Sequence, residues 1–184
     1  MSLALVRLAA AVECSDEFHL ARILLLLKAA GKKSKKPVEG ITKLAKLDFL
    51  ARYPAALVRL LEKLGKHAQA ARIPEQERQT IEGAMIRFRY GPWDERYRRW
   101  LALLAARGLV DVYQQGATVH AKLTEAGATQ ADALIATKEF KSLYERCKLV
   151  ATAVGDYGGT RLMNLIYEVF PEILDHRWGE RLHL

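Results

Sequence analysis

Histidine and cysteine are the side chains of this sequence that could bind a transition metal or act as nucleophiles. The histidines show no HxxxH or HxH spacing, and none stands at metal-ligand spacing from a cysteine. Cys14 and Cys147 lie too far apart in sequence for a local metal clip, so we interpret both as reduced, buried thiols. The histidines are His19, His67, His120, His176 and His183. We therefore expect no metal and no cofactor.

Sequence motifs for hydrolysis and phosphate binding are also absent. No GxSxG or GxxxxGK[ST] motif occurs, and the Gly158–Gly159 pair before a helix lacks the lysine of a phosphate loop. Asp111, His120 and Lys122 resemble part of a nuclease cluster but have no second carboxylate beside the lysine. The sequence therefore predicts a protein that is not an enzyme.

The remaining chemistry is cationic. Five arginines and two acidic residues give positions 89–107, within RYGPWDERYRRWLALLAARGLVDV, a local charge of +3. On the expected helix 94–107, the outward side carries Arg98, Arg99 and Ala102, without Asn, Gln, Ser or Thr to read base edges. Three interpretations stay open for these arginines: a solvated helix face, a protein interface, or contact with the DNA backbone.

The opposite side of that expected helix is aromatic and apolar. Trp93, Tyr97, Trp100, Leu101 and Leu104 follow helical spacing, which is typical of a core or an interface. A second cationic segment, KKSKKP at 32–37, reads as an exposed loop because four lysines repel one another ahead of a proline. The candidate contacts to a partner or to nucleic acid are Lys32, Lys33, Lys35, Lys36, Arg87, Arg89, Arg96, Arg98 and Arg99.

Length and composition limit the classes of protein and partner. The chain has 184 residues, 51% of them hydrophobic, so it can bury a real core. Its net charge of +8 favours an acidic partner: nucleic acid first, an acidic protein second, a membrane surface third. The N-terminal segment lacks the basic start of a signal peptide, and the apolar run 23–27 is too short to span a bilayer. We expect a soluble cytoplasmic protein that does not bind membranes.

The elements that must position these residues follow from periodicity. Apolar residues predict helices from Asp16 to before Gly31, from Ile41 to before Pro54, from there to Gly65, and over three segments after Thr124, the second with one apolar face from Phe140 to Val154. Residues 66–73 read as a polar connection, followed by a short helix from Pro74. The alternation in AMIRFRY predicts a strand over 84–90, ended by Gly91 and Pro92, with Asp94 as N-cap of the next helix.

A hairpin completes the pattern. Residues 109–113 and 118–123 predict two strands joined by a turn at Gly116. The order helix, helix, strand, helix, hairpin, helix predicts a mainly α protein with a small β-hairpin: a winged-helix-like domain over 1–136 with a helical insertion at about 51–83. Residues 137–184 would form a C-terminal helical extension packed on it.

Three motifs carry a resemblance to a known family. VEGITKLAKLDFLARYP at 38–54, the arginine-rich segment at 89–112 and GGTRLMNLIYEVFPEI at 158–173 resemble the middle components of bacterial three-component ABC systems, which include the Lamassu anti-phage systems. The likeness covers about residues 18–173 and includes no catalytic signature. It implies a non-catalytic adaptor that bridges an SMC-like ATPase and an effector, often a nuclease, in a hetero-oligomer, with possible non-specific contact to double-stranded DNA.

A DNA-binding alternative starts from part of the same pattern. The KL repeats, the YGP before a helix and the Gly-Leu-Val exit also resemble antitoxin-like winged-helix proteins. This resemblance implies a transcriptional regulator or antitoxin. A two-fold dimer whose DNA affinity falls steeply with salt would distinguish it from the adaptor.

Overall fold

The protein is mainly helical, with two small antiparallel sheets. The computed structural model describes residues 15–34, 37–79 and 84–182. In order, its elements are α2 (Asp16–Ser34), β1 (Val38–Glu39), α3 (Ile41–Arg52), α4 (Pro54–Lys63), α5 (His67–Ala70), α6 (Glu75–Arg78), β2 (Ile86–Phe88), β3 (Gly91–Trp93), α7 (Tyr97–Ala106), β4 (Val110–Gln115), β5 (Thr118–Leu123), α8 (Glu125–Ala136), α9 (Lys138–Val154), α10 (Gly159–Val169) and the 3₁₀ helix η1 (Pro171–Leu174).

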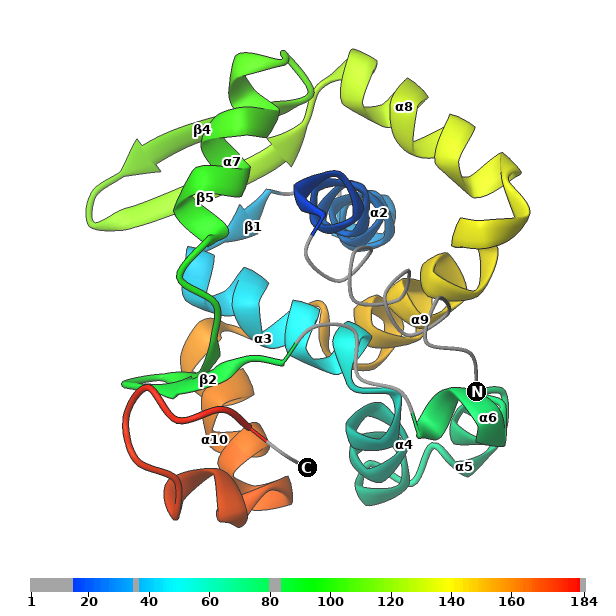
Figure 1. Ribbon diagram of the computed structural model, residues 1–184, viewed down its shortest axis with the longest axis vertical. Coiled ribbons are helices and arrows are strands. Elements are labelled where there is room, and N and C mark those ends of the chain that lie inside the picture. The colour runs from blue at the N-terminus through cyan, green and yellow to red at the C-terminus, as the bar shows by residue number, and fades with distance from the viewer. Residues whose placement is uncertain (1–14, 35–36, 80–83, 183–184) are drawn as a thin grey trace, which may run out of the picture.

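Helix α2 is the centre of the core. Its residues 20–27 are all buried, so the helix is enclosed on every side, as an all-round apolar sequence requires. Figure 1 shows α2 end-on, surrounded by α3, α7, α8 and α9. Helix α9 contacts both α2 and α3, and its predicted apolar face, from Leu143 to Val154, is buried. One hydrophobic cluster therefore includes residues on both sides of the predicted boundary at 136.

Proline and glycine set the helix boundaries between α3 and α4 as predicted. Helix α3 ends at Arg52, because the residue before a proline is unfavourable in helical geometry, and α4 begins with Pro54 in its first turn. Gly65, with φ of 69°, follows the end of α4. Residues 66–73 were predicted to be a polar connection. The prediction was wrong in one respect, because these residues contain the short helix α5.

The predicted hairpin is confirmed. Strands β4 and β5 pair antiparallel from Val110 opposite Leu123 to Gln115 opposite Thr118, with Gly116 in the turn at φ of 60°. Thr124 caps α8 by accepting a hydrogen bond from the Gly127 amide at 2.9 Å. The sequence did not reveal β1, which pairs with β5 and completes a sheet of order β1-β5-β4.

The strand predicted at 84–90 is shorter in the structure, where it covers only Ile86–Phe88. It belongs to a second sheet, separate from the sheet of the β4–β5 hairpin. Strand β2 pairs with β3, which begins at the glycine and proline expected to end the strand. Gly91 adopts φ of 111°, and Pro92 needs no ladder partner because β3 is an edge strand. The other edge of β2 is bonded by the C-terminal segment, where the Leu182 amide donates to the Met85 carbonyl at 2.8 Å.

The prediction of a helix over 94–107 was also wrong about where the helix starts. Helix α7 begins at Tyr97, and Asp94 does not cap it; the Asp94 carboxylate instead accepts a hydrogen bond from the Arg96 amide at 3.0 Å. The loop predicted at 32–37 is wrong over residues 32–34. Helix α2 continues through Gly31 to Ser34 and includes Lys32 and Lys33. Lys35 and Lys36 lie outside the described residues.

Candidate functional site

A buried ion network joins α2, α3 and α7. Asp48 of α3 accepts hydrogen bonds from Arg22 at 2.6 Å, from Arg52 at 2.8 Å and from the Tyr97 hydroxyl at 2.5 Å. All four side chains are fully buried. Arg52 also donates to Asp94, at 2.9 Å, just before α7. The network therefore fixes both ends of the segment that leads from β3 into α7.

The network keeps its carboxylates charged. Burial opposes ionisation of Asp48, but the charges of Arg22 and Arg52 outweigh it and hold the Asp48 pKa well below its usual range. Burial likewise opposes ionisation of Asp94, but hydrogen bonds from Arg96 and the nearby Arg52 lower its pKa to about 2. Both carboxylates are thus ionised and paired at neutral pH. They orient helices and are poorly suited to accept a proton in a reaction.

The sequence analysis missed this network. The detectable signal was the presence of ionisable residues inside apolar helices: Arg22 between buried residues of α2, and Asp48 and Arg52 four residues apart in α3. A charged residue on an apolar helix needs a partner, so these three could have been flagged. Their pairing across helices could not, because it depends on how α2 packs against α3.

The aromatic stripe of the predicted recognition helix belongs to the core. Four residues of the stripe are buried: Tyr97, Trp100, Leu101 and Leu104. These residues therefore belong to the core and not to an interface. The Trp100 indole donates to Asp16 at 2.9 Å, and its ring lies at 4.7 Å from the Arg96 guanidinium carbon. Helix α7 therefore presents only its opposite, polar side to solvent.

The arginines on that side differ in their pairing. Arg96 forms an ion pair with Asp94 at 2.8 Å, and Arg99 forms one with Asp16. Arg98 is exposed, and within the described ranges no ion pair of it is found. Two of the three predicted contacts on this segment are thus held by acidic residues of the protein itself. Among these three arginines, and within the described residues, Arg98 alone directs an uncompensated charge outward.

The structure does not bring all predicted cations together. Arg87 and Arg89 belong to the β2–β3 hairpin, where Arg87 donates to the His176 carbonyl at 2.6 Å and Arg89 is exposed. Lys32 and Lys33 lie at the far end of α2 from Asp16, the partner of Arg99. At a rise of 1.5 Å per residue, that separation is about 25 Å. The backbone positions of Lys32 and Lys33 are therefore far from the arginines of α7.

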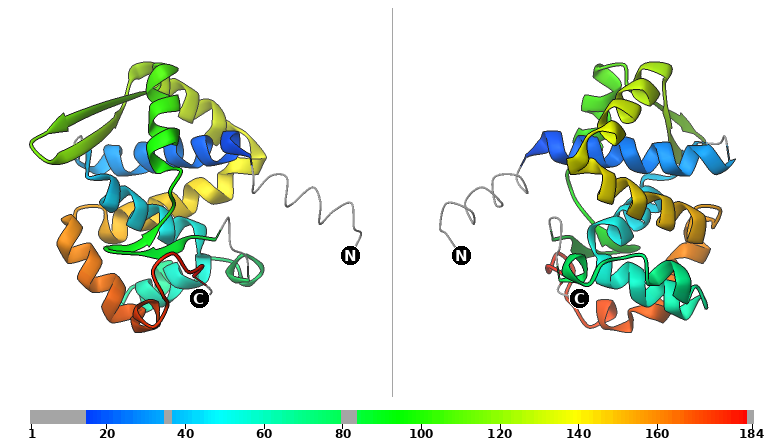
Figure 2. Two further views of the ribbon diagram at one scale, coloured as in Figure 1. Left: turned by 60° about the vertical axis from the view of Figure 1, so that its left-hand side comes forward. Right: turned by 90° about the vertical axis from the view of Figure 1, so that its right-hand side faces the viewer.

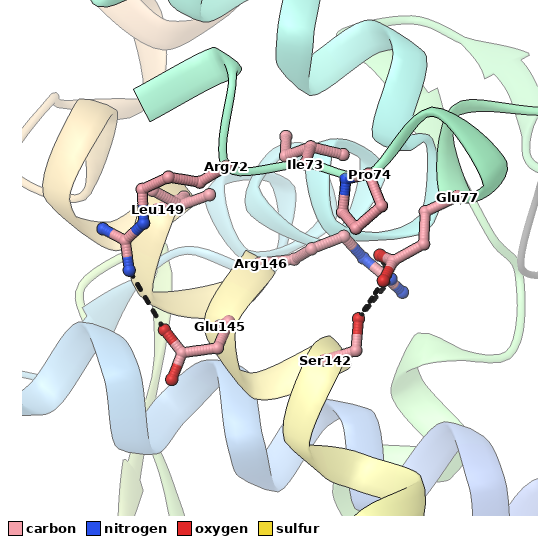
Figure 3. Close-up of a pocket in the computed structure, with 8 residues that line it drawn as sticks. All are labelled: Arg72, Ile73, Pro74, Glu77, Ser142, Glu145, Arg146 and Leu149. Carbon is pink, nitrogen blue, oxygen red and sulfur yellow. Dashed lines mark hydrogen bonds and ion pairs between the residues drawn. The ribbon is translucent and has the colours of Figure 1, made fainter. Parts of the chain in front are cut away.

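A small cleft lies between the α5–α6 segment and α9. It has a volume of about 90 Å³ and includes the apolar residues Ile73, Pro74 and Leu149 in its lining. Figure 3 shows paired polar groups at both ends of it. Arg72 meets Glu145 at 3.4 Å at one end; at the other, Glu77 accepts hydrogen bonds from Ser142 and, at 2.5 Å, from Arg146. These pairs tie the α5–α6 segment to α9.

Large apolar side chains are exposed at three places. Phe88 and Tyr90 lie on the β2–β3 hairpin, Val112 and Tyr113 on β4, and Leu174 and Trp178 at and after η1. Trp178 is the most exposed of them, at 66%. Figures 1 and 2 show the β4–β5 hairpin at the opposite end of the molecule from η1.

None of the described helices combines the length and apolar character needed to cross a bilayer. Among the described residues, no group of three or more His, Cys, Asp or Glu side chains is placed to bind a metal ion. Comparison with known proteins finds no matching family model, curated protein or solved structure.

Proposed function

We propose that this protein is a non-catalytic adaptor of the cytoplasm that bridges an SMC-like ATPase and an effector, such as a nuclease, in an anti-phage complex. The partner classes come from the resemblance of the three sequence motifs. What carries the bridging role is the separation of two exposed apolar sites: Val112 and Tyr113 on β4, and Leu174 of η1 followed by Trp178, whose neighbour Gly179 donates to the Arg87 carbonyl of β2 at 2.8 Å. Two separate sites allow two proteins to bind at once.

The proposal includes a winged-helix domain, without assigning DNA to it. Helices α2, α3 and α7 with the β1-β5-β4 sheet have the order of such a domain, and α4 to β3 would form the insertion. In this arrangement α7 would occupy the recognition position. Its outward charges are mostly paired internally, which favours a structural role for the helix over base reading.

The second candidate function is a winged-helix DNA-binding regulator or antitoxin. Exposed Arg98 on the helix in the recognition position favours it, since an unpaired arginine there can meet a phosphate. This function requires duplex binding that weakens steeply with salt and with Arg98→Gln.

A pull-down from the native host tests the adaptor proposal. The tagged protein is purified after nuclease treatment, and bound proteins are identified by mass spectrometry. We expect an ABC-type ATPase and an effector. Trp178→Ala should lose one partner and Tyr113→Ala the other, with both variants folded. Recovery of neither partner, together with salt-sensitive duplex binding that depends on Arg98, would establish the regulator instead.

A further inference from the structure

The β2–β3 hairpin alternates arginines and aromatic residues in a way that neither the core nor the adaptor role requires. Its sequence is Arg87, Phe88, Arg89 and Tyr90, and the two aromatic rings are 43% and 47% exposed. Exposing two large rings on one tight turn costs stability that burial would otherwise provide. Exposed apolar patches are typical of sites that bind a ligand or a partner.

The rings share one shallow hollow of about 10 Å³, so a ligand larger than a water molecule would rest on the exposed ring faces around it. Phe88, Tyr90 and Trp93 line it, together with Gly91, Pro92 and Thr42 at the start of α3. The Phe88 and Trp93 rings are stacked, with centroids 5.9 Å apart and planes at 26°. Trp93 in turn packs on buried Tyr97, at 5.3 Å. The hollow is therefore preorganised by the same segment that the ion network fixes in place.

One exposed cation, Arg89, and one buried cation, Lys46, lie near this hollow. The Arg89 guanidinium carbon lies 5.4 Å from the Tyr90 ring centroid, so charge and ring face solvent side by side. Beneath the hollow, the Lys46 side chain packs against Gly91, and its amine donates to the Thr42 carbonyl at 3.1 Å. Within the described part of the chain, no acidic residue lines the hollow. The surroundings favour an anionic ligand with a flat π system.

We propose that the hollow formed by Phe88, Tyr90 and Trp93 binds single-stranded nucleic acid, with bases stacked on the exposed rings and a phosphate at Arg89. Stacking on aromatic side chains combined with adjacent arginines is the general mode of sequence-tolerant single-strand binding. A duplex is a poor ligand for this hollow, because its bases already stack on one another. The site is independent of the proposed adaptor role and of Arg98 on α7.

Fluorescence anisotropy with the full chain tests the proposal. The probes are labelled oligo(dT) and oligo(U) of about 15 nucleotides and a mixed-sequence duplex of the same length. We expect single strands to bind more tightly than the duplex, and the tighter of the two single strands identifies DNA or RNA. Binding should weaken between about 50 and 200 mM salt, and Arg89→Gln should reduce the slope of log K against log salt by about 0.7.

Ring substitutions distinguish stacking from general charge attraction. The double variant Phe88→Ala, Tyr90→Ala should weaken single-strand binding about tenfold or more, whereas Tyr90→Phe, which keeps the ring, should not. Tyr113→Ala is the matched control, because Tyr113 is 44% exposed on the other hairpin. Unchanged melting temperatures would show that the variants are folded.

Three results would overturn the proposal. They are no binding to either single strand, equal loss of binding in Tyr113→Ala, or affinity that does not change when both rings are removed. In that case a loss of protein partners in the Phe88→Ala, Tyr90→Ala variant would assign the hairpin to a protein interface. Because the adaptor test uses Trp178 and Tyr113, each proposal can fail without the other.

Discussion

The Tyr97 hydroxyl donates a hydrogen bond to the Asp48 carboxylate at 2.5 Å, and both side chains are fully buried. This contact joins the first turn of α7 to the middle of α3. Because Arg22 of α2 binds the same carboxylate, one charge holds three helices in register. The orientation of α7, and with it the β3 segment that carries Trp93, depends on an electrostatic contact as well as on apolar packing.

Loss of that charge should be costly. Asp48→Asn leaves Arg22 buried without a countercharge, so we expect the free energy of unfolding to fall by about 3 to 5 kcal/mol. Urea denaturation measures this loss. Asp132→Asn is the control, since Asp132 pairs with Lys28 at the surface, and its loss should cost less than about 1 kcal/mol. Similar effects of the two substitutions would contradict a structural role for the network.

Acid should weaken the fold through the same carboxylates. The folded-state pKa of Asp94 is about 2, below the ordinary value of 3.8, so its stabilising contribution is complete above about pH 4 and is lost as pH falls toward 2. The pKa difference corresponds to about 2 kcal/mol. Urea unfolding from pH 6 downward should show this decline, and Asp94→Asn should show a shallower one. If wild type and Asp94→Asn lost stability in parallel as the pH falls, Asp94 would not be the group responsible.

Lys46 should have the opposite dependence on pH. Burial lowers its pKa from 10.5 to about 8, so between these values the unfolded chain holds more protons and stability rises with pH. Lys46→Met removes the penalty of burying the amine. We expect this variant to be more stable than wild type at pH 7 by up to about 3 kcal/mol, with a smaller difference at pH 10. A constant difference across this range would show that Lys46 does not titrate as stated.

Local patterns predicted most of the helices and the hairpin. The apolar stripe of α9, the end of α3 before Pro54, the Thr124 cap and the turn at Gly116 each depend on residues close in sequence. Short-range rules for spacing, capping and turns are sufficient there. The helical spacing of Trp100 predicted a core or an interface, and only the packing of α7 against α2 shows that it lies in the core.

Features that depend on distant contacts were not predicted. Strand β1 has two residues and forms only because β5 lies beside it, and β2 is completed by the C-terminal segment through Leu182. Gly31 looked like a helix end, but α2 continues past it because its preceding residues are held on all sides by neighbouring helices. The hollow at Trp93 is likewise visible only once β3 is seen to fold back on β2.

Two glycines should respond to alanine in opposite ways. Nothing lies within 4 Å of a Cβ added at Gly31, so Gly31→Ala should stabilise α2 by about 0.5 to 1 kcal/mol. At Gly127 an added Cβ would lie 1.8 Å from the Leu109 carbonyl oxygen, and the resulting displacement should cost about 1 to 3 kcal/mol or more. Thermal unfolding of both variants tests the pair. A stabilised Gly127→Ala would show that α8 and the β4 entrance are less tightly packed.

Two tryptophans separate stability from partner binding. Trp100 is fully buried and bonded to Asp16, so Trp100→Ala should lower the free energy of unfolding by about 3 to 5 kcal/mol. Trp178 is 66% exposed, so Trp178→Ala should change the free energy of unfolding by less than about 0.5 kcal/mol. The same variant should lose a partner in the pull-down. Urea denaturation and partner recovery are measured on the same preparations. If Trp178→Ala keeps every partner, the C-terminal site is not an interface, and the adaptor would have to bind through the β4–β5 hairpin alone.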